Sequence, residues 1–177
     1  MALNLIAFFS ASGQKYFSKN ATIQFNGGTS LEKIEGVSST ANTVVDAATG
    51  QIEFAVLVNG FRFEKALMEE HFNENYLEST KYPKSTFKGQ IENPSAIQWT
   101  KPGSYKTQIK GKLTLHGVTK DISVPGEFTV SAAGIQGKSN FKVKCEDYGI
   151  KIPSLVRDKI AQEINISVNS NYQAFNK

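Results

Sequence analysis

Apolar and polar residues alternate with a period of two along most of the chain. Between Val118 and Val130, six of the seven even-numbered positions are apolar or glycine, and Lys120 is the exception. Because successive side chains of a β-strand point to opposite faces of the sheet, this segment is predicted to be a strand with one buried face. The same pattern, and therefore the same prediction, applies to residues 87–91, 109–115, 135–145 and 160–168.

Segments near 15–25, 30–45 and 52–58 bring the total to about eight strands. Several of them extend over roughly ten residues, which is long for a sandwich and usual for a closed barrel. We therefore predict an all-β fold, an eight-stranded antiparallel up-and-down barrel. Segment 52–58 is apolar on both faces, so we expect another element to cover its outer face.

One segment, residues 63–78, departs from this alternation. Leu67, His71 and Phe72 recur there at helical spacing, and glutamates lie early, where the helix dipole favours acidic groups. We predict a short helical segment over residues 64–76 that crosses the barrel or caps its mouth.

The N-terminus begins with a short apolar run, Ala2–Ala11, followed by small residues. This resembles the end of a secretory signal peptide, although no basic residues precede the run. We treat residues 1–14 as a signal-peptide remnant or N-terminal extension, and residues 15–177 as a single domain large enough to bury a core. A periplasmic or secreted protein is expected.

Composition excludes several classes of function. The net charge is +4, but the lysines are spread through the strand-like segments, which favours a solvated basic surface over a nucleic-acid patch. No run reaches the roughly 18 apolar residues of a membrane span, so no stable membrane insertion is expected. The single cysteine excludes an internal disulfide and a cysteine-based zinc cluster, and we expect no metal site.

The aromatic residues, 12 Phe and 6 Tyr, indicate what the barrel encloses. An eight-stranded barrel is wide enough either to be filled by side chains or to hold one slender ligand. Glycines on the inward phase of several strands leave room for a ligand. We predict a ligand-binding interior lined by Phe54, Phe61, Phe63, Phe72, Phe87, Ile109, Leu113, Leu115, Phe128 and Phe141, with His71, Tyr76 and Lys120 near its mouth.

The two histidines are the first candidates for chemistry. His116 and Gly117 form a two-residue loop between two strands, where a type I′ turn requires positive φ at both positions. His116 also lies on the outward phase, so we assign it a structural role in the turn. His71 lies beside apolar residues of the helical segment, and two interpretations stay open: an interfacial side chain, or an acid or base.

Cys145 and Lys120 both fall on inward phases. A buried cysteine is usually an inert apolar group, so we expect Cys145 to line the core or pocket, with a nucleophile or redox sensor as the alternative. Lys120 either meets a polar ligand group at the barrel rim or bends out to water.

Several motifs occur together in one order. The segments are Tyr82–Gly89 (YPKSTFKG), Gly111–Pro125 (GKLTLHGVTKDISVP), Glu146–Pro153 (EDYGIKIP) and Ile160–Asn169 (IAQEINISVN). Gly111–Pro125 resembles the strand–turn–strand signature of the YceI-like family, and the other three segments resemble further sequence motifs of that family. The resemblance covers roughly residues 20–172.

The resemblance implies a lipocalin-like barrel that holds a polyisoprenoid or similar long-chain lipid in an apolar tunnel. It implies a periplasmic or secreted binding protein, often a dimer, with no catalytic residues to transfer. The lead hypothesis is a non-enzymatic carrier of a hydrophobic small molecule, such as an isoprenoid or isoprenoid quinone, with no other cofactor and with a homodimer left open. The alternatives are an enzyme acting on a lipid-like substrate through His71, and a filled barrel serving as a stress-response or interaction module.

Overall fold

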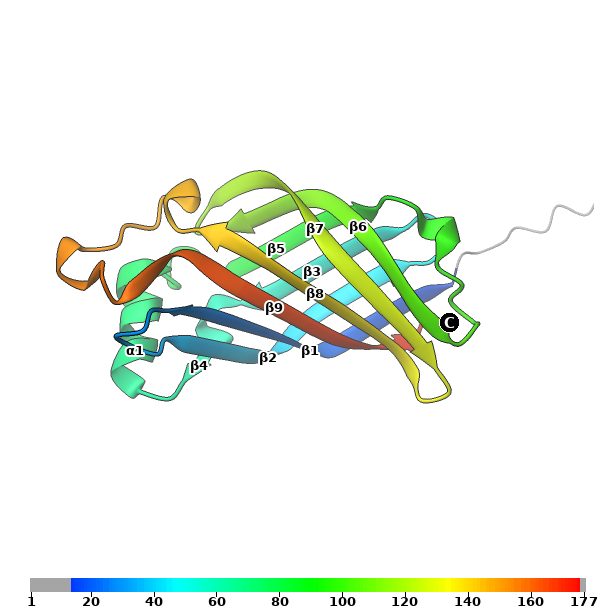
Figure 1. The fold of residues 1–177 in the computed structure, drawn as a ribbon, viewed down its shortest axis with the longest axis horizontal. Coiled ribbons are helices and arrows are strands. Elements are labelled where there is room, and N and C mark those ends of the chain that lie inside the picture. The colour runs from blue at the N-terminus through cyan, green and yellow to red at the C-terminus, as the bar shows by residue number, and fades with distance from the viewer. Residues whose placement is uncertain (1–13, 176–177) are drawn as a thin grey trace, which may run out of the picture.

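A computed structural model describes residues 14–175. Within this range eight strands close into an antiparallel barrel, which confirms the predicted fold (Figure 1). These strands are β1 (Lys15–Gly28), β2 (Glu35–Asp46), β3 (Gln51–Leu57), β5 (Lys84–Ile91), β6 (Gly103–Leu115), β7 (Val118–Ser131), β8 (Gly134–Lys144) and β9 (Ile160–Ala174). The expectation of a signal-peptide remnant or extension at 1–14 falls, except for Gln14, outside the described residues.

Each barrel strand pairs with its neighbours along the chain, and β1 also pairs with β9, which closes the ring. The two-residue β4 (Arg62–Phe63) pairs with Gly36 and Val37, at the end of β2 that β3 leaves unpaired. Closure of the barrel pairs the backbone groups of the two strand edges that an open sheet would leave exposed. The eight strands therefore form one continuous wall around the interior.

The outer face of β3 differs from the prediction. Within residues 14–175 no element covers this face at Leu57, which is 46% exposed. The inner face, represented by Ile52 and Val56, is buried as the alternation indicates. The apolar residue on the outer face therefore reflects the tolerance of strands for scattered exposed apolar side chains.

The β6–β7 hairpin has the predicted two-residue turn. Leu115 pairs with Val118, and the intervening His116 and Gly117 have φ values of +51° and +74°. Both values lie in the left-handed region that a type I′ turn requires. The turn prediction is confirmed.

The predicted helical segment consists of α1 (Ala66–His71) followed directly by the π-helical turn η2 (Phe72–Tyr76). It lies across one end of the barrel, next to the turn between β1 and β2 (Figure 1). Two bonds to the Glu69 carboxylate, from the Arg62 guanidinium at 2.9 Å and the Phe63 amide at 3.3 Å, fix α1 against β4. None of the helices in residues 14–175 is long and apolar enough to cross a membrane.

The opposite end of the barrel is closed by side chains. The loop that carries η3 (Pro94–Ala96) places Trp99 there, stacked on Tyr16 with ring centroids 5.5 Å apart and edge-on to Phe128 at 5.0 Å. Tyr16 and Phe128 belong to the largest cluster of buried apolar residues, and the partly buried Trp99 packs against it. The barrel therefore has one packed end and one end covered by a short helix.

Candidate functional site

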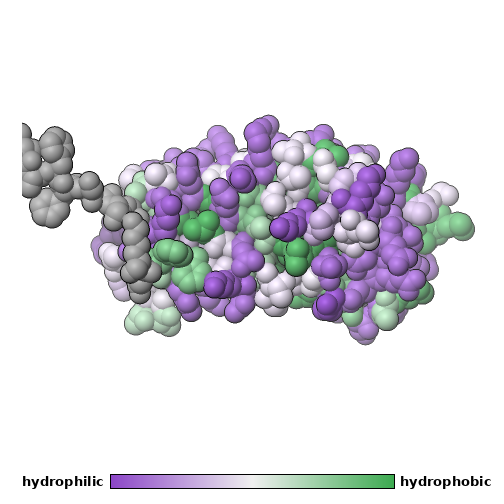
Figure 2. Space-filling view, turned by 180° about the vertical axis from the view of Figure 1, so that it is seen from behind, coloured by the Kyte–Doolittle hydropathy of each residue, from purple (hydrophilic) through white to green (hydrophobic). Residues whose placement is uncertain are grey.

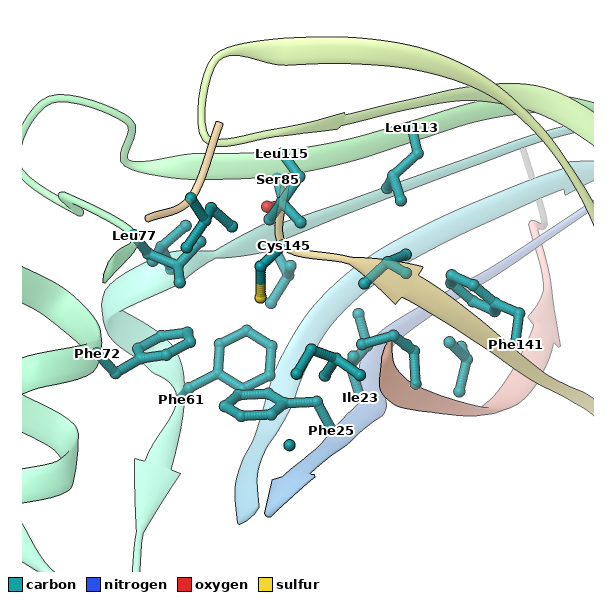
Figure 3. A pocket seen from close by; sticks show the side chains of 18 of the residues that line it. Ile23, Phe25, Phe61, Phe72, Leu77, Ser85, Leu113, Leu115, Phe141 and Cys145 are labelled. Carbon is teal, nitrogen blue, oxygen red and sulfur yellow. The ribbon is translucent and has the colours of Figure 1, made fainter. Parts of the chain in front are cut away.

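The interior of the barrel holds an apolar cavity of about 600 Å³. This volume lies in the range of roughly 300–1,000 Å³ that is usual for small-molecule sites. Inward side chains such as Ile23, Leu113 and Phe141, from β1, β6 and β8, point into one space (Figure 3). The period-two alternation produces this arrangement, because it directs one apolar set of each strand to the inside.

The structure brings twelve of the thirteen predicted site residues to this cavity. Those twelve are Phe54, Phe61, Phe63, His71, Phe72, Tyr76, Phe87, Ile109, Leu113, Leu115, Phe128 and Phe141. That they contact a ligand stays a prediction.

Lys120 is exposed and lies outside the cavity lining. It pairs with Leu113 near the end of the hairpin, on the same phase as the lining residue Ile122. Its long side chain reaches water from that position, as lysines beside apolar surface commonly do. The interpretation that Lys120 contacts a ligand at the rim therefore has no support from its position.

A cluster of phenylalanines lies between α1–η2 and the cavity. Phe72 stacks on Phe25 with centroids 5.2 Å apart and contacts Phe61 and Phe63 at 5.6 and 5.0 Å. Such ring pairs stabilise beyond their buried area. Phe72 thus attaches the short helix to the barrel wall and makes it part of the lining.

The mouth of the cavity lies between α1, the β1–β2 turn and the segment from residue 151 to 159. Lining residues from these three segments include Glu32, Lys65, Leu67 and Lys159. The Glu32 carboxylate accepts from Lys65 at 3.4 Å and pairs with Lys159 at 3.6 Å. One carboxylate therefore bridges two of the segments that border the mouth.

His71 lies at this mouth with an exposed side chain. Within residues 14–175 its ring has no hydrogen-bonded or ion-paired side chain, the partner that an acid or base role requires. The same residues hold no group of three or more His, Cys, Asp or Glu side chains placed to bind a metal ion.

The cavity favours neutral groups. Cys145 lines it, and burial raises the pKa of the thiol above its ordinary value of 9.0. Burial, and then the nearby Cys145, raise the pKa of the Tyr76 hydroxyl. Both groups are uncharged at neutral pH, so the interior suits an apolar molecule.

The deep part of the cavity contains a few hydroxyl groups. Burial raises the pKa of Tyr172 to about 12, against the smaller opposing effect of its hydrogen-bond partner, the Thr43 hydroxyl. The Tyr172 hydroxyl lies 3.2 Å from that of Thr43. The Ser170 hydroxyl lies near Tyr172 but makes no hydrogen bond, although Ser170 is only 1% exposed. The deep end is therefore mostly apolar with one unpaired hydroxyl group.

His116 corrects one sequence expectation. The outward phase of its strand predicts an exposed ring, but only 12% of its side chain is exposed. The alternation ends at the turn, where positive φ redirects the side chain, so the strand phase does not determine its direction. The ring contacts Tyr82 edge-on at 4.7 Å and bonds to the backbone carbonyl of Tyr148 at 3.1 Å.

The prediction missed lining residues on the first and last strands. Ile23 and Phe25 on β1 and Ile164 and Ile166 on β9 all line the cavity. A signal was present, because Ala21, Ile23 and Phe25 alternate with polar residues as the predicted lining does. Pairing of β1 with β9 brings both sets into the same wall.

The model of the YceI-like domain matches residues 16–172 of this chain. This chain belongs to the YceI-like family. The matched range spans nearly the whole barrel, from the second residue of β1 to Tyr172 in β9, so the family assignment and the observed fold concern the same residues. Among curated proteins, none matches this chain.

Solved structures share this YceI-like fold at low sequence identity. A polyisoprenoid binding domain from Saccharophagus degradans, implicated in plant cell wall breakdown, has a TM-score of 0.77 and 13% identity and covers 92% of this chain and 99% of its own. BcnA of Burkholderia cenocepacia has a TM-score of 0.69 and 17% identity, covering 84% and 94%. A Campylobacter jejuni YCEI protein has a TM-score of 0.63 and 19% identity, covering 84% and 89%. These similarities concern the fold.

Proposed function

We propose that this protein is a carrier that holds a polyisoprenoid or similar long-chain lipid inside the barrel. The observation that carries the proposal is the continuous apolar cavity behind a helix-covered mouth. Family membership supports it, as does the shared fold with a domain described as polyisoprenoid binding. Burial of apolar surface contributes roughly 25 cal/mol per Å², so a long chain binds with few polar contacts.

The alternatives have less support. A filled barrel is at odds with a cavity of about 600 Å³. An enzyme acting through His71 requires a polar partner beside that ring, and the described residues offer none. We therefore propose a binding protein without catalysis, in keeping with its family.

We also propose that the carrier works in the periplasm or outside the cell. The short apolar run at residues 2–11 supports this proposal at the level of sequence. Cell fractionation with N-terminal sequencing of the mature chain tests it. Recovery of the chain in the cytoplasm with an intact N-terminus would contradict it. A homodimer remains an expectation that sedimentation measures directly.

The carrier proposal is tested by filling the cavity with a side chain. Leu113 points into it from β6 (Figure 3). Its neighbour Lys112, on the opposite face of the strand, is exposed. Leu113→Trp should reduce uptake of added polyprenol by delipidated protein at least about tenfold, because the indole occupies the ligand's space. Lys112→Trp is the matched control and should bind as the natural protein does. Equal uptake by both variants would contradict binding inside the barrel.

A further inference from the structure

Three leucines on the segments around the mouth are exposed to solvent. Leu31 in the β1–β2 turn is 66% exposed, Leu67 on α1 is 60% exposed and Leu155 in η5 (Ser154–Val156) is 90% exposed. Seen from behind, apolar side chains protrude at the end of the molecule that carries these segments (Figure 2). Single exposed leucines are common on soluble proteins, so their shared position is the informative feature.

The three segments are held together as one surface. Glu32 follows Leu31 and pairs with Lys65, two residues before Leu67, and with Lys159, beyond Leu155. The Thr29 hydroxyl also donates to the Asp158 carbonyl at 2.8 Å, which links the β1–β2 turn to the η5 segment. The leucines therefore project from one interconnected rim around the mouth, which we call the leucine rim (Leu31, Leu67 and Leu155).

The charge around the leucine rim is uneven. The segment 151–159 carries Lys151, Arg157 and Lys159 against the single acid Asp158, so Leu155 lies in a basic setting. An apolar side chain flanked by basic residues is complementary to the surface of an anionic bilayer. The basic residues attract the anionic headgroups, and the apolar side chain inserts toward the hydrocarbon below them. The α1 side of the rim is more acidic, which favours an approach with η5 nearest the bilayer.

The cargo supplies the reason for a bilayer partner. A long-chain lipid that crosses water exposes apolar surface at about 0.8 kcal/mol per CH₂ group, a large barrier for a chain of many such groups. A mouth that rests on the bilayer removes most of that exposure. The leucines surround the opening through which the cargo must pass, because Leu67 and the neighbours of Leu31 and Leu155 line the cavity.

We infer that the leucine rim docks the mouth on the surface of an anionic lipid bilayer, with Leu155 inserted first, so that cargo passes directly between bilayer and cavity. This inference rests on the proposed carrier function. It assigns the partner as a membrane surface, and binding is peripheral and reversible.

Vesicle flotation tests the docking with phosphatidylcholine vesicles that contain a minority of phosphatidylglycerol. Leu155→Ser should lower the vesicle partition coefficient roughly tenfold, since the side chain loses its burial in the interface. Leu57→Ser is the matched control, because Leu57 is exposed on the outer face of β3 and does not line the cavity. It should leave partitioning unchanged, and high salt should weaken binding of the natural protein. Circular dichroism checks that both variants fold.

A second measurement separates docking from carrying. Polyprenol delivered in detergent should load the natural protein, L155S and L57S equally, while polyprenol in vesicles should load L155S more slowly. If the natural protein loads from detergent but does not float with vesicles, docking is overturned and the carrier function stands. The same conclusion follows if all three proteins load from detergent and L155S and L57S float and load from vesicles alike. If substitution of the leucines only dissociates a homodimer, the rim is a protein interface and the bilayer assignment is wrong. If no polyprenol is taken up from either source, the carrier function and the docking both fail.

Discussion

The imidazole Nε2 of His116 lies 2.7 Å from Oε2 of Glu78, a residue 38 positions earlier in the chain. These two are the non-glycine residues with positive φ in the described range, +51° and +45°. The other ring nitrogen faces the Tyr148 carbonyl. Both partners are acceptors, and a neutral imidazole carries one N–H, so the tautomer of the ring determines which of the two bonds it donates. His116 thereby joins the β6–β7 hairpin to the segment that follows η2 and to η4 (Glu146–Tyr148).

Replacement of His116 should therefore destabilise the protein through its contacts rather than through the turn. Asparagine also tolerates positive φ, so His116→Asn keeps the turn and removes both bonds. We expect a loss of about 1–2 kcal/mol in the free energy of unfolding, measured by urea titration, since a bond to a charged but partly exposed group is lost. Glu78→Gln and the double variant complete the cycle. A change below about 0.5 kcal/mol for H116N would show that the bonds contribute nothing.

Cys145 gives a probe of the cavity, since it is the single cysteine of the chain. Burial raises the pKa of its thiol, so at a given pH less reactive thiolate is present than in an exposed cysteine. Alkylation by iodoacetamide at pH 8 should be slower in the folded protein than in urea. In the folded protein, the pH at which the alkylation rate is half-maximal should lie above 9.0. Bound polyprenol should slow the reaction further by covering the thiol. Equal rates in folded and unfolded protein would contradict this environment.

The unpaired hydroxyl of Ser170 predicts an unusual response to substitution. A buried polar group without a partner costs about 1–3 kcal/mol, so removal of the hydroxyl relieves that cost. In delipidated protein Ser170→Ala should leave the free energy of unfolding unchanged or raise it by up to about 1 kcal/mol. Thr43→Val is the contrast, because it removes the partner of the Tyr172 hydroxyl and should destabilise. A loss of more than about 1 kcal/mol in S170A would reveal a partner for Ser170.

The sequence predicts the barrel and most of its lining because strand alternation is a local property. Leu113 and Phe141 follow directly from that alternation, and both line the cavity. Lys120 follows the same phase but is exposed, because side-chain length allows its charge to leave the interior. The contact between His116 and Glu78 could not be predicted from the sequence, because only the closed barrel brings their two segments together. The leucine rim is equally non-local, because its members come from three separate segments: the β1–β2 turn, α1 and η5.

Native mass spectrometry tests the central claim most directly. Protein purified without organic solvent, then delipidated by extraction and incubated with polyprenol, should acquire one polyprenol mass per barrel, and Leu113→Trp should prevent it. The extract itself should contain a long-chain lipid. A natural protein that carries no lipid on purification and acquires no polyprenol mass, while it remains folded, would contradict the proposed carrier function.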